Sequence, residues 1–337
     1  MIASVVLLAV VVLLAGCDGG SPSSAEDPAP GLPFEARVQV QGIPTDATPA
    51  LHGPAWLLQG DGRPVLDAVA AQIDSVAASA VDVVVLAASF PTGGRPTPEC
   101  DAMVDLPSVN RCTTLTLPDP NAASLDTITT HIKQAEVVYF AGGNQCDYVK
   151  WGGSPLHRAV TDAVARGGGM GGGSAGLAIQ GSVVYDGCTG SVRSSEAMAD
   201  PYDPAIHFTR DMFAWPVLDA LVTDSHFQER DRMGRLAAFL AREHAERSLD
   251  VMDGLGVNEG AAMVVGPTGR ARVIGNGAFF LRVDHPPERV AVGQPLTASN
   301  IAIVRLSDGE TYDLTARPMD AAARHDIENG TWTTDPY

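Results

Sequence analysis

From Ala55 to the glycine-rich segment before Ser174, short apolar runs alternate with segments of helical spacing, and this alternation constrains the fold most strongly. Residues 82–88, apolar from Val83 onward, and residues 137–141 are runs typical of strands buried on both faces of a parallel sheet. Shorter strands are expected at 56–59 and 113–117, helices at 65–80, 124–134 and 155–166, and a long loop at 90–112. The alternation predicts a three-layer α/β/α fold with a mostly parallel sheet and right-handed crossovers.

The pattern changes after Arg289. Two short strands are expected at residues 301–306 and 311–314, and the dipeptide Asp308-Gly309 between them is a strong hairpin signal. We therefore expect the following organisation after the N-terminal region: one α/β domain at 54–288, a C-terminal β-hairpin of the same domain at 289–320, and a tail at 321–337.

Composition narrows the possible partners. The 337 residues are 45% hydrophobic, which excludes wholesale disorder and fibrous repeats. Forty acidic against 22 basic side chains give a net charge of −18 without any basic run. We therefore expect no nucleic-acid partner, because binding to phosphates needs a basic surface.

The first 16 residues are almost entirely apolar and too few for a typical transmembrane helix, so they predict a signal peptide. The tetrapeptide Leu14-Ala15-Gly16-Cys17 resembles a bacterial lipobox, which implies lipidation of Cys17; an ordinary apolar anchor is the alternative. Residues 17–53 are rich in Ser, Pro, Gly and acids, which predicts a flexible tether. We expect an exported bacterial lipoprotein, anchored to a membrane, whose folded domain is periplasmic or extracellular.

Four cysteines remain if Cys17 is lipidated. An even number in an exported chain favours disulfides, and four cysteines permit three pairings. Cys100 and Cys112 are closest in sequence and flank a loop rich in Pro and Asp, so they are the favoured pair and leave Cys146 with Cys188. A four-cysteine zinc site is the alternative, but no CxxC spacing supports it.

Ser174 lies in Gly172-Gly173-Ser174-Ala175-Gly176, which matches G-x-S-x-G and precedes an expected helix. Such a segment forms a nucleophile elbow, although a structural loop is an equally valid interpretation and a phosphate-binding loop is another. A serine nucleophile needs a base, and the base needs an orienting acid. Of the eight histidines, only His226 follows an apolar strand, residues 217–223, within a dense polar segment.

Three arginines follow this histidine, at the start of a helix expected to run to about Arg247. Positive charges at the N-terminus of a helix are unfavourable, because they oppose the helix dipole. The presence of Arg230, Arg232 and Arg235 there is therefore better explained by binding of an anion than by a contribution to helix stability. Salt bridges to nearby acids are the alternative.

Four separated blocks resemble the cyanophycinases and, more distantly, aspartyl dipeptidases of the dipeptidase E type. The blocks are Phe140-Ala141-Gly142-Gly143-Asn144-Gln145 (family F-x-G-G-D-Q), residues 171–176 (G-G-T-S-A-G), residues 224–236 (D-Q-H-F-x-x-R-x-R-x-x-R-L) and residues 254–262 (G-I-G-I-D-E-x-T-A). A weaker fifth match is residues 273–277 (V-I-G-x-G). They follow the family order.

The resemblance implies a fold similar to class I glutamine amidotransferases and a serine peptidase that hydrolyses cyanophycin, a polyaspartate carrying arginine on each β-carboxyl. It makes Ser174 the nucleophile, His226 the base and Glu259 the orienting acid. Amides of Ala175 and Gly143 would form the oxyanion hole. Substrate-binding roles fall on Gln145, Asp224, Ser225, Arg230, Arg232 and Arg235. No metal or cofactor is implied, and relatives form homodimers.

This sequence departs from the family pattern at several positions, of which four bear on the expected site. Gly173 replaces Thr, Ser225 replaces Gln, Asn258 replaces Asp and Asn144 replaces Asp. These changes keep the triad but leave the substrate open. The alternatives are a peptidase of the same clan with a different acidic substrate, and a lipoprotein that uses the fold as a binding module.

Overall fold

The computed structural model describes residues 34–90 and 98–337. The predicted signal peptide and the lipidation site Cys17 lie outside the described residues. Within residues 34–90 and 98–337, no helix has the length and apolar character needed to cross a membrane.

The first sheet has nine strands in the order β1-β4-β3-β5-β6-β2-β11-β12-β15. Its centre is parallel and confirms the predicted core, with these strands: β4 (Val109–Thr116), β3 (Val81–Ala87), β5 (Val137–Phe140), β6 (Gly169–Gly173) and β2 (Ala55–Gln59). Antiparallel strands extend it on both sides: β1 (Arg37–Gly42) on one, and β11 (Ala261–Val265), β12 (Arg270–Gly275) and β15 (Thr311–Asp313) on the other.

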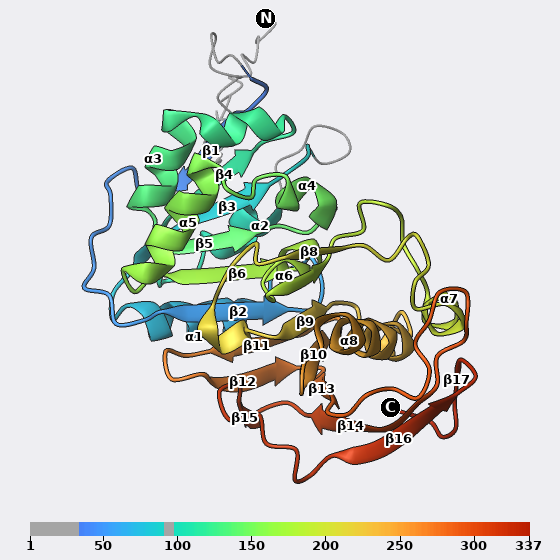
Figure 1. Cartoon of the computed structure of the whole chain (residues 1–337). Helices are drawn as coiled ribbons and strands as arrows, with labels where there is room; N and C mark the ends of the chain where they lie inside the picture. Colours follow the sequence, from blue (N-terminus) through green and yellow to red (C-terminus); the bar gives the residue numbers. More distant parts are fainter. Residues whose placement is uncertain (1–33, 91–97) are drawn as a thin grey trace, which may run out of the picture.

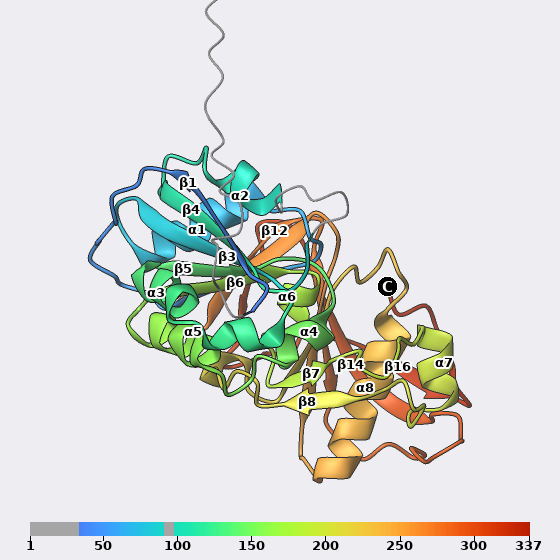
Figure 2. The same ribbon diagram turned by 90° about the horizontal axis from the view of Figure 1, so that it is seen from above.

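Helices cover both faces of this sheet, as the three-layer prediction requires (Figure 2). On one face lie α1 (Leu66–Val76) and α2 (Pro98–Met103), packed with Val83 and Val85 of β3. On the other lie α3 (Asp126–Gln134) and α5 (Pro155–Ala165), packed with Val84 and Leu86. Alternate residues of one strand thus enter two cores, which explains its continuous apolar run.

A second sheet, which the sequence did not predict, has the order β17-β16-β14-β13-β10-β9-β7-β8. Its strands are β7 (Val183–Tyr185), β8 (Phe208–Arg210), β9 (Leu221–Asp224), β10 (Met252–Val257), β13 (Ala278–Val283), β14 (Ala298–Leu306), β16 (Ala323–Glu328) and β17 (Thr331–Trp332). The helix α8 (Met233–Arg247) packs on it through Leu236, Phe239 and Leu240 and contacts α7 (Ser194–Ala199) (Figure 1).

The predicted C-terminal hairpin is wrong. The chain does turn at Gly309, but β14 belongs to the second sheet and β15 to the first. The reason is a competing partner: Gly309 N donates to Val273 O, and Val273 N donates to Glu310 O, each at 2.9 Å. After the turn, the chain therefore pairs with the edge of β12 and not with β14. The tail, for which no structure was expected, adds β16 and β17 to the second sheet.

Two further boundaries differ from the sequence expectations. Residues 37–42, placed in the flexible tether, form β1 and pair with β4 along its whole length. The expected loop at 90–112 contains α2 and the beginning of β4. The α1 helix ends at Val76, before the expected residue 80, because Ala77 becomes extended and bridges to Leu51.

Candidate active site

Ser174 lies between β6 and the short helix α6 (Ala175–Ala178), at the carboxyl end of a central parallel strand. Its φ of 53° and ψ of −109° are rare for a residue with a side chain and typical of a nucleophile elbow. The adjacent glycines are required by close backbone approach. A Cβ at Gly173 would lie 2.1 Å from Asp61 O, and one at Gly176 would lie 2.1 Å from Phe140 O.

The three side chains of the predicted triad, Ser174, His226 and Glu259, are connected by hydrogen bonds. Ser174 Oγ is 2.8 Å from His226 Nε2, and His226 Nδ1 is 2.5 Å from Glu259 Oε1. His226 follows β9 and Glu259 follows β10, two neighbouring parallel strands of the second sheet. The triad therefore combines a serine from the first sheet with a histidine and a glutamate from the second.

The backbone holds the histidine in place. His226 has a φ of 45°, and its amide donates to Gly60 O at 2.9 Å. Burial lowers the pKa of the imidazole; the Glu259 carboxylate opposes this shift, and the charges of Arg230 and Arg232 add to it. The net lowering keeps the ring neutral at pH 7, so Nε2 can accept a proton from a hydroxyl.

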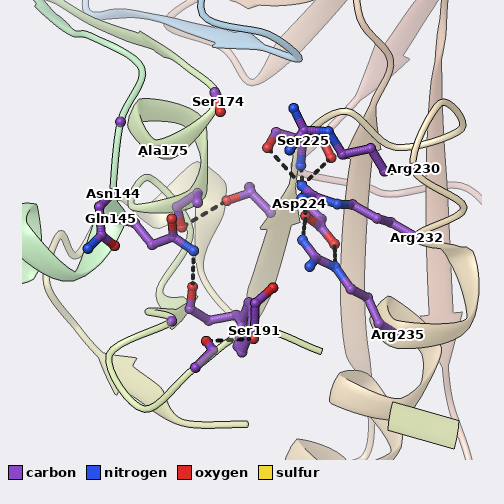
Figure 3. A pocket seen from close by; sticks show the side chains of 16 residues that line it. Asn144, Gln145, Ser174, Ala175, Ser191, Asp224, Ser225, Arg230, Arg232 and Arg235 are labelled. Atoms are coloured by element: carbon purple, nitrogen blue, oxygen red, sulfur yellow. Dashed lines mark hydrogen bonds and ion pairs between the residues drawn. The ribbon is translucent and has the colours of Figure 1, made fainter. Parts of the chain in front are cut away.

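A pocket of about 180 Å³ opens at Ser174. Every predicted substrate-binding residue lines it: Gln145, Asp224, Ser225, Arg230, Arg232 and Arg235. Figure 3 shows Asn144 and Gln145 on one side of the pocket and the three arginines on the other. Residues far apart in the sequence therefore meet around one serine.

The arginines differ in how much of their charge is free. Arg235 and Asp224 are buried and joined by two hydrogen bonds, Nε to Oδ2 at 2.7 Å and Nη2 to Oδ1 at 2.5 Å. Burial raises the pKa of Asp224, but Arg235 and Arg232 outweigh it and hold that pKa below its usual range. The salt-bridge interpretation thus holds for Arg235, and Asp224 is not free to receive a substrate guanidinium.

The other two arginines leave positive charge in the pocket. Arg232 Nη1 contacts Ser225 O at 2.8 Å and the already paired Asp224 at 3.3 Å. Burial, together with the charges of Arg235 and Arg230, lowers the pKa of Arg232 to about 10, which still leaves it protonated at neutral pH. The Arg230 side chain is 53% exposed, and its nearest carboxylate oxygen, on Glu259, is 3.9 Å away. The pocket therefore suits an anionic group.

The two residues expected to form the oxyanion hole, Ala175 and Gly143, also line the pocket. Within residues 34–90 and 98–337, neither backbone amide donates a hydrogen bond to another protein group. Both donors are therefore available beside Ser174. Their role in catalysis remains a prediction.

A disulfide ties the pocket together. The structure contains both favoured pairs, Cys100–Cys112 and Cys146–Cys188, so these cysteines form no zinc site. Cys146 lies on α4 (Gln145–Val149), and Cys188 lies in the loop after β7. In addition, Gln145 Nε2 donates to Tyr185 O at 3.2 Å. The second disulfide thus joins the Gln145 side of the pocket to the loop after β7, whose Gly187 also lines it.

No three His, Cys, Asp or Glu side chains cluster as a metal site in the described part of the chain. Two departures from the family pattern have structural roles. Asn144 Oδ1 caps α4 by accepting from Cys146 N at 3.1 Å. Asn258 accepts from Gln228 N at 3.2 Å and donates to Asn276 O at 3.1 Å, which supports the loop that follows His226.

The sequence did not single out three other pocket residues, Tyr185, Ser191 and Thr223. Tyr185 and Thr223 belong to β7 and β9 of the unpredicted second sheet. Only Thr223 carried a signal, because it directly precedes Asp224 in the strand before the histidine.

No protein-family model matches the chain. The chain is 30% identical over 108 residues to the cyanophycinases of Trichormus variabilis and of a Nostoc species, which is 31% of this chain and 34% of each relative. It thus spans about a third of the length of these curated relatives. Among solved structures, it is similar to a peptidase from an acI-B1 actinobacterium (TM-score 0.49, 16% identity, 79% of this chain and 98% of that one). It is also similar to a putative peptidase E protein from Listeria monocytogenes (TM-score 0.42, 12% identity, 66% of this chain and 99% of that one). Over these 108 residues, the chain is similar in sequence to the cyanophycinases.

Proposed function

We propose that this protein is a serine peptidase that hydrolyses a peptide or isopeptide bond beside a substrate carboxylate, and that cyanophycin is its first candidate substrate. One observation carries the proposal. The strained Ser174, a neutral His226 and Glu259 are in hydrogen-bond contact at the mouth of a pocket with surplus positive charge.

In the first half of the reaction, Ser174 Oγ attacks the carbonyl carbon while its proton passes to His226 Nε2. Glu259 accepts a hydrogen bond from Nδ1–H, which fixes the tautomer and stabilises the imidazolium. The carbonyl oxygen becomes negative, and the amides of Ala175 and Gly143 stabilise it. The imidazolium then protonates the leaving nitrogen, the C–N bond breaks, and an ester on Ser174 remains.

In the second half, water takes the place of the leaving amine. His226 Nε2 removes a proton from the water, whose oxygen attacks the ester carbon. The proton returns to Ser174 Oγ as the C–O bond breaks, and the carboxylic product leaves. The enzyme regains its starting protonation state, so no cofactor is needed.

The pocket's charge bears on the choice of substrate. Each unit of cyanophycin carries a free carboxylate, which suits Arg230 and Arg232, and a guanidinium. Asp224 is the only carboxylate lining the pocket in the described residues, and Arg235 occupies it. This favours a second candidate, an aspartyl dipeptidase that acts on an acidic substrate without a guanidinium.

We also propose that the protein is exported and anchored through lipid on Cys17. The support is the apolar segment and lipobox-like tetrapeptide at the N-terminus. The two disulfides agree with an oxidising compartment. Radiolabelled palmitate in the wild type but not in Cys17→Ala would support this, and equal labelling would contradict it.

The deciding experiment measures products from cyanophycin and from an α-linked aspartyl dipeptide. Wild type is compared with Ser174→Ala and with Ser191→Ala, a matched loss of a hydroxyl in the same pocket. We expect Ser174→Ala to lower kcat by about 10⁴-fold or more, and Ser191→Ala to keep most activity. Whichever substrate is cleaved identifies the better candidate. If neither is cleaved and a fluorophosphonate does not label Ser174, the peptidase proposal is wrong.

A further inference from the structure

A second hollow of about 330 Å³ adjoins the pocket at Ser174. The two share Ser191, Arg230, Arg232 and Arg235, so these side chains form a common wall. The second hollow is completed by residues that do not line the first: Val192, Arg193, Ser194, Ser195 and Asp231. A substrate bound at Ser174 can therefore continue over the arginines into a second basic space.

The segments around the second hollow are held together by hydrogen bonds. Arg235 N donates to Ser194 Oγ at 3.0 Å, and Arg235 Nη1 donates to Val192 O at 3.3 Å. Ser194 Oγ donates in turn to Asp231 O. Arg193 lies between two of these anchored residues, so its backbone is fixed while its side chain is exposed. The hollow is built from one connected unit.

The charge of this unit is unusual for the molecule. Four guanidiniums line the hollow against one carboxylate, Asp231, in a chain whose net charge is −18. Arg235 is neutralised by Asp224 from the first pocket, and Tyr337 Oη donates to Asp231 at 3.2 Å. Among the described residues, the Arg193 guanidinium forms no ion pair. A surplus of guanidiniums over carboxylates, with Arg193 unpaired, in an acidic protein points to an anionic ligand.

We infer that the second hollow binds the carboxylate of a further unit of the substrate chain, and that Arg193 determines the preference for longer acidic substrates. This inference rests on the proposed function, because it takes the substrate to be a chain that carries repeated carboxylates. Arg230 and Arg232 bind the carboxylate of the unit next to the scissile bond, and Arg193 binds the carboxylate of the following unit on the same side, which a two-unit substrate lacks. The enzyme would thus act better on oligomers than on the shortest cleavable substrate.

The test measures binding without turnover. Fluorescent β-aspartyl-arginine oligomers of two and six units are titrated into Ser174→Ala, alone and combined with Arg193→Gln. The matched control is Arg272→Gln, an exposed arginine on β12 outside both pockets. We expect Arg193→Gln to weaken binding of the long oligomer about fivefold and to leave the short one unchanged, because one partly exposed charge pair is lost. Added salt should reduce the difference between the oligomers.

An equal effect of Arg193→Gln on both oligomers, or none on either, would overturn the inference. So would equal affinity of the two oligomers for the Ser174→Ala protein. The readout is independent of catalysis. Length-dependent binding through Arg193 without hydrolysis by the wild type would therefore refute the proposed function and leave the second site standing.

Discussion

Replacing Gly173 is the sharpest test of the geometry around Ser174. The resembling family has Thr at this position, so resemblance alone predicts that Gly173→Thr is tolerated. The structure predicts the opposite. A Cβ at residue 173 would lie 2.1 Å from Asp61 O and 2.9 Å from both Gln59 Nε2 and Tyr139 Oη.

The cost follows from what would have to move. Asp61 O is fixed by Gln59 Nε2, which donates to it at 2.8 Å, so the oxygen cannot swing aside. Strand β6 and the 60–62 loop would have to separate by roughly 1 Å. Overpacking of this kind lowers the free energy of unfolding by about 1–3 kcal/mol. Because the clashing atom belongs to the backbone and cannot rotate away, we expect Gly173→Ala to lower it by about 3 kcal/mol. For a chain of 337 residues, that corresponds to a fall in Tm of roughly 4–5 °C.

The same movement would reach the active site. Gly60 O accepts the His226 amide at 2.9 Å, and Gly62 Cα lies 3.2 Å from the Cβ position of Gly142, next to the proposed oxyanion donor. A displacement of about 1 Å at the base lowers kcat by roughly 100-fold. We therefore expect Gly173→Ala and Gly173→Thr to lose both stability and activity.

The assay combines thermal unfolding with the rate of fluorophosphonate labelling of Ser174, which requires no knowledge of the substrate. Gly62→Ala is the matched control in the same loop, because its Cβ would meet only Gly142 Cα, at 3.7 Å. It should change Tm by less than about 2 °C. A Gly173→Ala protein with wild-type Tm and labelling rate would refute the steric reasoning.

Three further predictions concern the supports of the site. Because the pKa of His226 is lowered, kcat/KM should be constant at neutral pH and fall only below about pH 6.5, as the imidazole gains a proton; a pH profile with a midpoint above this value would contradict the neutral base. The free energy of unfolding should also decline as pH falls through the same window, because the unfolded histidine binds the proton more readily. Replacing Cys146 and Cys188 with Ser opens a loop of 42 residues, and the gain in entropy of the unfolded chain should lower the free energy of unfolding by about 4 kcal/mol. It should also raise KM, because the residues that line the pocket are no longer held together. Unchanged Tm and KM would exclude a role for this disulfide. Tyr337→Phe removes the hydroxyl that accepts from Met233 N at 3.1 Å and donates to Asp231, so we expect a loss of about 1 kcal/mol and a raised KM; an altered labelling rate of Ser174 would show that the residue acts on the nucleophile instead.

Local patterns explain what the sequence predicted well. The runs at 82–88 and 137–141 became β3 and β5 because a strand between two helical layers needs apolar residues on both faces. The glycines around Ser174 indicated an elbow because backbone approach forbids side chains there. The site residues were found through motifs, since each block carries its chemistry in a few adjacent positions.

The sequence by itself predicted the parallel core, the elbow at Ser174, the favoured cysteine pairs and part of the pocket lining, although it missed Tyr185 and Ser191. The tertiary structure alone decided which partners those residues have. Asp224 was expected to bind substrate, but Arg235 neutralises it, because α8 returns across the end of β9. Strands β14 and β15 were expected to pair, but an open edge of β12 competes for the second. Periodicity reports which face of a strand is buried, whereas the choice among distant edges and charges depends on contacts that no local pattern encodes.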